Sequence, residues 1–118
     1  MRSIKEISLS ETVLTKLLKY CEKREYVADQ DVIYKGHSPH VGFLIIKGIG
    51  IAKGSKSVKY LAPGVCVGIR ELANGGQLKY NFQIKSGAVT LIVDKSALYE
   101  MRESEDPDIQ FFVEKAIA

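Results

Sequence analysis

The sequence has no tryptophan, only two cysteines and two histidines, and no long apolar run. Cys21 and Cys66 lie far apart in apolar contexts, so we expect reduced thiols in the core rather than a disulfide. The longest purely apolar run, Phe43 to Ile46, is far too short to span a membrane. The first residues lack the apolar segment of an export signal. These absences predict a cytoplasmic protein without a membrane span.

The two histidines, His37 and His40, stand close together in the segment His-Ser-Pro-His. Two imidazoles could begin a metal site, but Ser38-Pro39 marks a turn and no third ligand follows at a recognisable spacing. Cys66 has no histidine near it in the sequence that would indicate a nucleophile with its base. We therefore expect an exposed turn, no metal, no cofactor and no enzymatic activity.

The charge of the chain is modest and unevenly distributed. A net charge of +3 and 46% hydrophobic content over 118 residues fit one domain, residues 1–118, and give no argument for nucleic acid. Residues 1–60 hold 11 basic and 6 acidic side chains, whereas residues 61–118 hold 6 and 8. The acidic excess near the end is either a solvated helical face or a docking surface for a basic partner.

Apolar side chains at helical spacing predict an N-terminal helix over about residues 9–23. Ser8 and Glu11 fit a capping box, with Ser8 as the N-cap and Glu11 three residues later. The basic side chains of this segment are expected to face water. The apolar positions are Val13, Leu14, Leu17, Leu18 and Cys21.

Two C-terminal helices are predicted over about residues 95–117. Asp94 is the expected N-cap of the first, and Asp106 followed by Pro107 is a start signal for the second. We expect the apolar stripe of the last helix either to cover the barrel as a lid or to bind a partner. This stripe consists of Ile109, Phe112, Val113, Ala116 and Ile117.

Between the helices, over about residues 26–94, the pattern changes to short apolar runs separated by turn residues. Tyr80, Phe82 and Ile84 alternate with polar residues, as in a strand that buries one face. Several such strands predict an antiparallel sandwich or barrel. The runs begin at Val27 and then occupy residues 32–34, 41–46, 49–52, 58–61, 65–67, 78–84 and 88–93.

Four segments, in this order, resemble the cyclic nucleotide-binding domain family, the sensor module of catabolite-activator-type regulators. They are residues 31–37 (DVIYKGH, with His where Asp is usual), 43–48 (FLIIKG), 63–68 (PGVCVG) and 93–98 (VDKSAL). The resemblance covers about residues 9–117. It implies a mainly β fold, an eight-stranded antiparallel jelly roll with an N-terminal helix and C-terminal helices. It also implies a role in signalling, with a protein partner or a second copy bound through the helices.

The segment PGVCVGIREL, residues 63–72, resembles the approach to the family's phosphate-binding cassette. In the family, a Glu after the glycine that matches Gly68 accepts a hydrogen bond from the ribose, and a later Arg meets the cyclic phosphate. Ile69 stands in place of that Glu. The Arg is expected near Leu78 or Lys79, where none occurs, and a lysine lacks the bidentate fork of an arginine.

The expected pocket has therefore lost its two main ligand-binding side chains. A ribose hydroxyl left unpaired at Ile69 would cost about 1–3 kcal/mol. Arg70 and Glu71 are the remaining charges. They either face the pocket or, as we prefer, pair with each other or face water. The candidate pocket residues are Gly68, Ile69, Arg70, Glu71, Leu72, Lys79 and Tyr80.

Two functions remain open. The missing Glu and Arg favour a degenerate domain that acts as a protein-interaction or regulatory module, and we prefer this hypothesis. The glycines and the loop Asn74-Gly75-Gly76, whose backbone amides suit an anion, favour a sensor of a cyclic nucleotide or another anionic ligand in a nonstandard pose. Family regulators often carry a helix-turn-helix after the sensor. None follows residue 118, so we expect no DNA binding by this chain.

Overall fold

The computed structural model describes residues 4–118, which form two antiparallel sheets and four helices. The five-stranded sheet has the order β1-β7-β4-β9-β2, and the four-stranded sheet has the order β3-β8-β5-β6. The predicted class, a mainly antiparallel β fold with helices toward both ends, is confirmed. The strands are β1 Ile4–Glu6, β2 Glu22–Glu25, β3 Gln30–Ile33, β4 Val41–Lys47, β5 Gly50–Lys53, β6 Val58–Leu61, β7 Val65–Val67, β8 Asn81–Ile84 and β9 Val89–Asp94.

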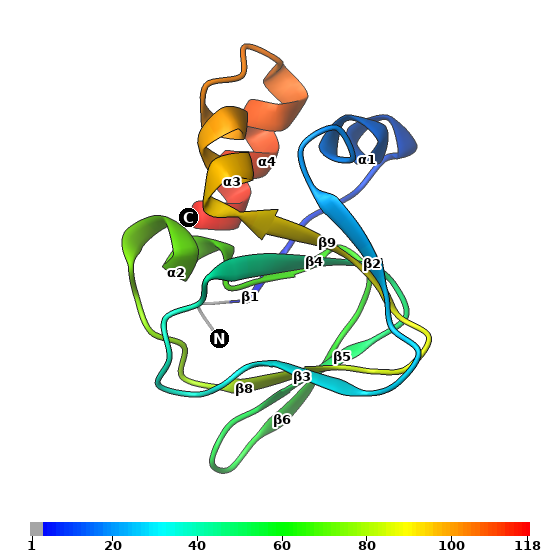
Figure 1. Ribbon diagram of the computed structural model, residues 1–118, viewed down its shortest axis with the longest axis vertical. Coiled ribbons are helices and arrows are strands. Elements are labelled where there is room, and N and C mark those ends of the chain that lie inside the picture. Colours follow the sequence, from blue (N-terminus) through cyan, green and yellow to red (C-terminus); the bar gives the residue numbers. More distant parts are fainter. Residues whose placement is uncertain (1–3) are drawn as a thin grey trace.

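The helices lie on one side of the five-stranded sheet, and the four-stranded sheet lies on the other (Figure 1). In β4, Phe43 and Ile45 pack between the two sheets, whereas Leu44 packs beneath the helices. Because both faces of β4 are covered, its sequence is a continuous apolar run rather than an alternating one. The helices are α1 Glu11–Leu17, α2 Ile69–Asn74, α3 Lys95–Arg102 and α4 Pro107–Ile117.

The strand β2 is the element that differs most from the apolar pattern. All four of its residues, Glu22–Glu25, are charged and exposed, yet they pair with β9 at the edge of the five-stranded sheet. Charges on an edge strand discourage pairing with another chain. The first predicted run was therefore misplaced, since the strand starts at Glu22 and Val27 is an exposed residue beyond it. The short strand β1, which pairs with β7, has no counterpart among the predicted runs.

The helix α1 is shorter than the predicted span of residues 9–23 and has a different cap. Its N-cap is Ser10 rather than Ser8, and the Ser10 hydroxyl oxygen accepts a hydrogen bond from the Val13 backbone N–H at 3.2 Å. The helix ends at Leu17. The apolar spacing continues further because Cys21, just after the following turn, is buried in the same core, although Leu18 in that turn is exposed.

The C-terminal helices match their predicted start signals. The Asp94 carboxylate accepts from the Ala97 backbone N–H at 2.7 Å at the start of α3, and Asp106 caps α4 with Pro107 as its first residue. Of the two roles expected for the apolar stripe of α4, the covering role is the one the structure has. Its buried members are Ile109, Phe112, Val113 and Ala116.

A charged contact joins α1 to α4. Lys16 Nζ lies 3.1 Å from Asp106 Oδ1 and 2.7 Å from Asp108 Oδ2. The hydrogen bonds that Lys16 donates to Asp108 and Asp106 raise the pKa of Lys16, and the bond that Asp106 accepts lowers the pKa of Asp106. Because Asp106 is also the N-cap, this contact fixes the start of α4 against α1.

Both cysteines are free and buried, as predicted. Burial, together with the nearby Asp94 charge, raises the pKa of Cys21 to about 12. Burial also raises the pKa of Cys66. Within residues 4–118, no helix has the length and apolar character that crossing a bilayer requires.

Candidate functional site

The candidate site begins at Gly68, between β7 and α2. Gly68 has a φ of +81°, a left-handed conformation that glycine adopts without strain. It is buried, and a Cβ at this position would lie 3.0 Å from Ile33 Cδ1 of β3. The Ile33 side chain therefore lies against the backbone that precedes α2 and leaves little room in front of it.

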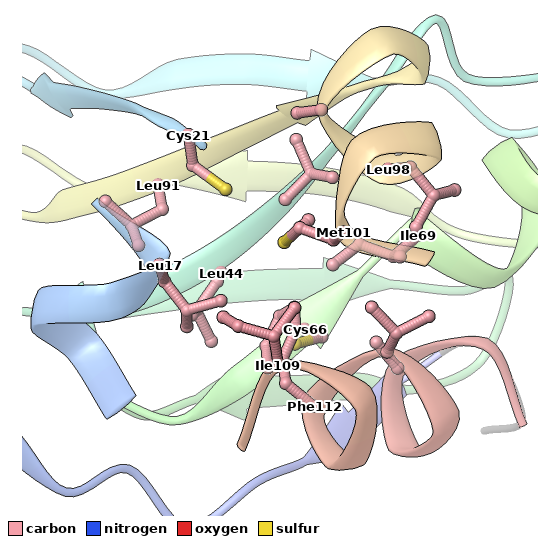
Figure 2. Packing of buried hydrophobic residues seen from close by; sticks show 14 of the residues in the cluster. Leu17, Cys21, Leu44, Cys66, Ile69, Leu91, Leu98, Met101, Ile109 and Phe112 are labelled. Atoms are coloured by element: carbon pink, nitrogen blue, oxygen red, sulfur yellow. The ribbon is translucent and has the colours of Figure 1, made fainter. Parts of the chain in front are cut away.

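Ile69, the first residue of α2, belongs to the cluster beneath the helices. Its side chain is 1% exposed and packs in the same cluster as Leu98 and Met101 of α3 (Figure 2). It also lies against Gly42 of β4. The position that the resemblance assigns to a ribose-binding Glu is thus part of the structural core and offers no side-chain acceptor.

Glu71 is buried, which corrects the prediction that it pairs with Arg70 or faces water. Its side chain is 7% exposed, and Oε1 has no hydrogen-bond partner. It packs against Gly76, where a Cβ would lie 3.4 Å from Glu71 Cγ. Arg70 is half-buried and lies outside the ion pairs formed by residues 4–118. No sequence signal marks this burial, because a Glu between Arg and Leu is typical of a surface helix.

Within residues 4–118, the buried polar or charged residues are Glu71 and Thr90. Thr90 is satisfied, since its hydroxyl lies 2.9 Å from the Tyr26 hydroxyl. Buried polar atoms in proteins nearly always have a partner. Among the buried side-chain oxygens and nitrogens of residues 4–118, the Glu71 Oε1 atom is therefore the one without a hydrogen-bond partner.

The loop after α2 turns back into the four-stranded sheet. Gly75 ends the helix in a left-handed conformation, with φ +76°, and Asn74 Oδ1 accepts from the Gly76 backbone N–H at 2.9 Å. Leu78 is buried, and its backbone bonds to Gly36 N–H at 2.7 Å and to His37 O at 3.1 Å. These bonds fix the loop against the turn that follows β3.

The last two candidate pocket residues, Lys79 and Tyr80, differ in their exposure to solvent. Lys79 is exposed, whereas Tyr80 is half-buried and packs edge-on to Phe82 with ring centroids 6.3 Å apart. Leu72 is buried with Ile69 beneath the helices. The structure thus buries Ile69 and Leu72 of α2 in the core beneath the helices and leaves Lys79, the candidate phosphate-binding cation, in solvent.

The histidine turn lies in the segment that connects β3 to β4. His37 and His40 are both exposed, and the His37 ring lies 6.1 Å from that of Tyr34. In the part of the chain that the structure describes, no three histidine, cysteine or acidic side chains gather as metal ligands would. The two imidazoles therefore stand alone in an exposed turn.

Comparisons with known proteins rest on structure, because no family model and no curated protein matches the sequence. A structure from a cyclic-GMP-dependent signalling pathway that regulates bacterial phytopathogenesis superposes with a TM-score of 0.79 at 14% identity. It covers 95% of this chain and 94% of its own. The c-di-GMP responsive global regulator CLP of Xanthomonas campestris gives 0.71 at 16% identity, covering 91% of this chain and 56% of its own.

The catabolite activator protein of Thermus thermophilus gives a TM-score of 0.69 at 15% identity, over 88% of this chain. The present chain spans 51% of that protein. These likenesses, with the sheet order and the helices described above, show that the chain has the fold of cyclic nucleotide-binding domains. The expectation drawn from the four sequence segments is confirmed at the level of the fold.

Proposed function

We propose that this chain is a non-catalytic regulatory domain that acts by binding a protein partner and whose degenerate cassette binds no cyclic nucleotide. The observation that carries the proposal is the burial of Ile69. Its side chain packs beneath the helices, so a ribose hydroxyl in the family's position would find no acceptor there. Such an unpaired group costs about 1–3 kcal/mol, on the order of ten- to hundredfold in affinity.

Two further observations support this proposal. The only cation at the expected phosphate position, Lys79, is exposed and is a point charge rather than a fork. Ile33 lies against Gly68, which narrows the approach to α2. Solved structures that share the fold include a global regulator and a catabolite activator protein, which favours a regulatory role over a catalytic one.

A thermal-shift titration with cyclic AMP, cyclic GMP and cyclic di-GMP tests the proposal. A ligand at a hundred times its dissociation constant adds about 2.7 kcal/mol of stability, which raises Tm by about 10 °C in a domain of this size. We expect no shift up to millimolar concentrations. The kinase regulatory domain that was solved with Sp-2Cl-cAMPS bound serves as the positive control. A saturable shift with any of the three nucleotides would overturn the proposal.

The free Glu71 oxygen favours a second candidate function, a sensor of a small ligand. A buried carboxylate oxygen without a partner could accept a hydrogen bond from a ligand hydroxyl or amine. In that case the anionic part of the ligand would be held by Arg70 or Lys79. Arg70→Ala or Lys79→Ala should then weaken binding of any nucleotide that shifts Tm. Unchanged affinity in both variants would argue against this pocket assignment.

A further inference from the structure

A cleft lies between the end of α2 and one face of α3. It has a volume of about 340 Å³. Leu72 and Ala73 line it from α2, and Lys95, Leu98, Tyr99 and Arg102 line it from α3. Gly68, Ile69 and Lys79 do not line it. We call it the α2–α3 cleft, and of the candidate nucleotide-pocket residues it shares Leu72 alone.

The α3 residues of the cleft form a single helical face, because their spacing is i, i+3, i+4 and i+7. Leu98 is buried at the floor, whereas Tyr99 is 68% exposed. Lys95 and Arg102 are exposed and lie about 10 Å apart along the helix. In the described part of the chain, neither takes part in an ion pair. The cleft therefore presents two free cations on either side of an exposed aromatic ring.

We propose that the α2–α3 cleft binds an acidic segment of a partner protein. The segment would carry two carboxylates about two helical turns apart and one apolar or aromatic side chain between them. Arg102 can hold a carboxylate through its planar fork, and Lys95 can hold the second as a point charge. Tyr99 supplies a large contact surface at low cost in side-chain entropy, as tyrosines at interfaces commonly do. This inference rests on the proposed role as a protein-interaction module.

The charges of the cleft disfavour a second copy of this chain as the occupant. Antiparallel pairing of two α3 helices about their midpoint would place Lys95 opposite Arg102 of the other copy, and like charges at an interface are costly. The acidic groups at the start of α4 are also engaged, since Asp106 and Asp108 pair with Lys16 of the same chain. A different chain with complementary acidic charge is therefore the occupant that fits.

Binding of a designed peptide tests the inference. The probe is a short fluorescein-labelled helical peptide with two glutamates seven residues apart and a phenylalanine midway between them. Its control has glutamine at both glutamate positions. We expect the glutamate peptide to bind more tightly, with an affinity that falls as salt rises. In ¹H–¹⁵N spectra, the shifted resonances should be those of α3 and the end of α2.

Charge reversal and truncation locate the contact. Lys95→Glu, Arg102→Glu and Tyr99→Ala should each weaken binding by about tenfold or more, with Tm unchanged because all three side chains are exposed. Lys59→Glu on β6, also exposed, is the matched control and should leave the affinity unchanged. Equal binding of the two peptides, or full binding by the Arg102→Glu and Lys95→Glu variants, would overturn the inference.

Sedimentation equilibrium tests whether a second copy of this chain occupies the cleft. A dimer that Arg102→Glu dissociates would show that a second copy fills the cleft, and it would overturn the assignment to a partner protein. The nucleotide titration keeps the two proposals apart. A saturable nucleotide shift overturns the proposed function, whatever the peptide does. A flat nucleotide response with no peptide binding leaves that function standing and removes the α2–α3 cleft from it.

Discussion

Gly42 of β4 and Ile69 of α2 are in direct contact where this helix meets the five-stranded sheet. A Cβ on Gly42 would overlap Ile69 Cγ1 and would lie 3.0 Å from the backbone N and Cα of Ile69. The absence of a side chain at Gly42 is therefore what lets α2 sit against the sheet. The same contact explains why the residue after Gly68 is held as core rather than turned toward a ligand.

Gly42→Ala should lower the free energy of unfolding by about 1–3 kcal/mol, because the added methyl group overpacks this contact. Ile69→Ala alone should cost about 2–5 kcal/mol, since it leaves a cavity beneath the helices. The double variant should be more stable than the sum of the two effects predicts, because removing Cγ1 relieves the overlap. Urea unfolding measures all three. If the two single-variant changes in unfolding free energy add up to that of the double variant, the side chain of Ile69 is not what makes a methyl group at Gly42 costly.

Glu71→Met should stabilise the domain by about 1 kcal/mol or more. The substitution keeps an unbranched side chain of similar length and removes a buried oxygen that has no partner. Thermal and urea unfolding measure the change, with the exposed Glu103→Met as the control. A clear loss of stability would mean that the Glu71 carboxylate has a partner in solution, and it would remove the observation that favours the ligand-sensing candidate.

The Lys16–Asp106 contact should make stability depend on pH in the acidic range. The pKa of Asp106 is lowered from its ordinary 3.8 in the folded protein, so its contribution is present above pH 3.8 and is lost as pH falls through the folded value. Asp106→Asn keeps a good N-cap but removes the charge. The stability difference between wild type and this variant should therefore shrink below pH 3.8.

The control for that experiment is Glu105→Gln, which neutralises an exposed neighbouring charge outside the ion pairs of the described residues. Stability measured at alkaline pH tests the same contact through Lys16, whose pKa is raised above 10.5. Its contribution is fully present below pH 10.5 and is lost as pH rises through the folded value. A wild-type advantage that is constant from acid to neutral pH would contradict the contact.

The two thiols should react with a thiol reagent only when the domain opens. Burial raises the pKa of Cys21 to about 12 and also raises that of Cys66, so almost no thiolate exists at neutral pH, and access is blocked as well. Labelling of the native protein should therefore be slow, whereas the urea-unfolded chain should label quickly at both sites. A Cys66→Ala variant isolates Cys21. Fast labelling of the folded protein would show that the turn before β2 opens readily.

The fold was largely predictable because its signals are local and redundant. The Asp94 cap, the Asp106-Pro107 start and the apolar runs of β4 and β9 each follow from side-chain chemistry near the element itself. The strand β2 was not predicted because its four residues are all charged and show no apolar alternation. Only its pairing with β9 makes this segment a strand. The end of α1 at Leu17 could not be predicted because Cys21, four residues further on, is buried at helical spacing in the same core.

The candidate site was less predictable because its properties depend on tertiary contacts. The sequence indicates that Ile69 cannot accept a hydrogen bond, but not that it fills a space left by Gly42. The burial of Glu71 depends on how α2 meets the loop at Gly76, for which the sequence has no period. The face formed by Lys95, Tyr99 and Arg102 could have been found from helical spacing alone. The sequence alone does not show that Lys95 and Arg102 are unpaired and border a cleft, because that depends on how α2 packs beside α3.

The position of β9 between β4 and the edge strand β2 has a consequence for how the chain is made. Both of its neighbours, β2 and β4, are synthesised well before it, and each must wait for Val89–Asp94 to emerge. Pairings between segments so distant in sequence fold slowly, commonly in milliseconds to seconds. During synthesis, the ribosome therefore releases two unpaired strand edges first and the strand that joins them almost last. The nascent domain depends on its final third to become protected from aggregation.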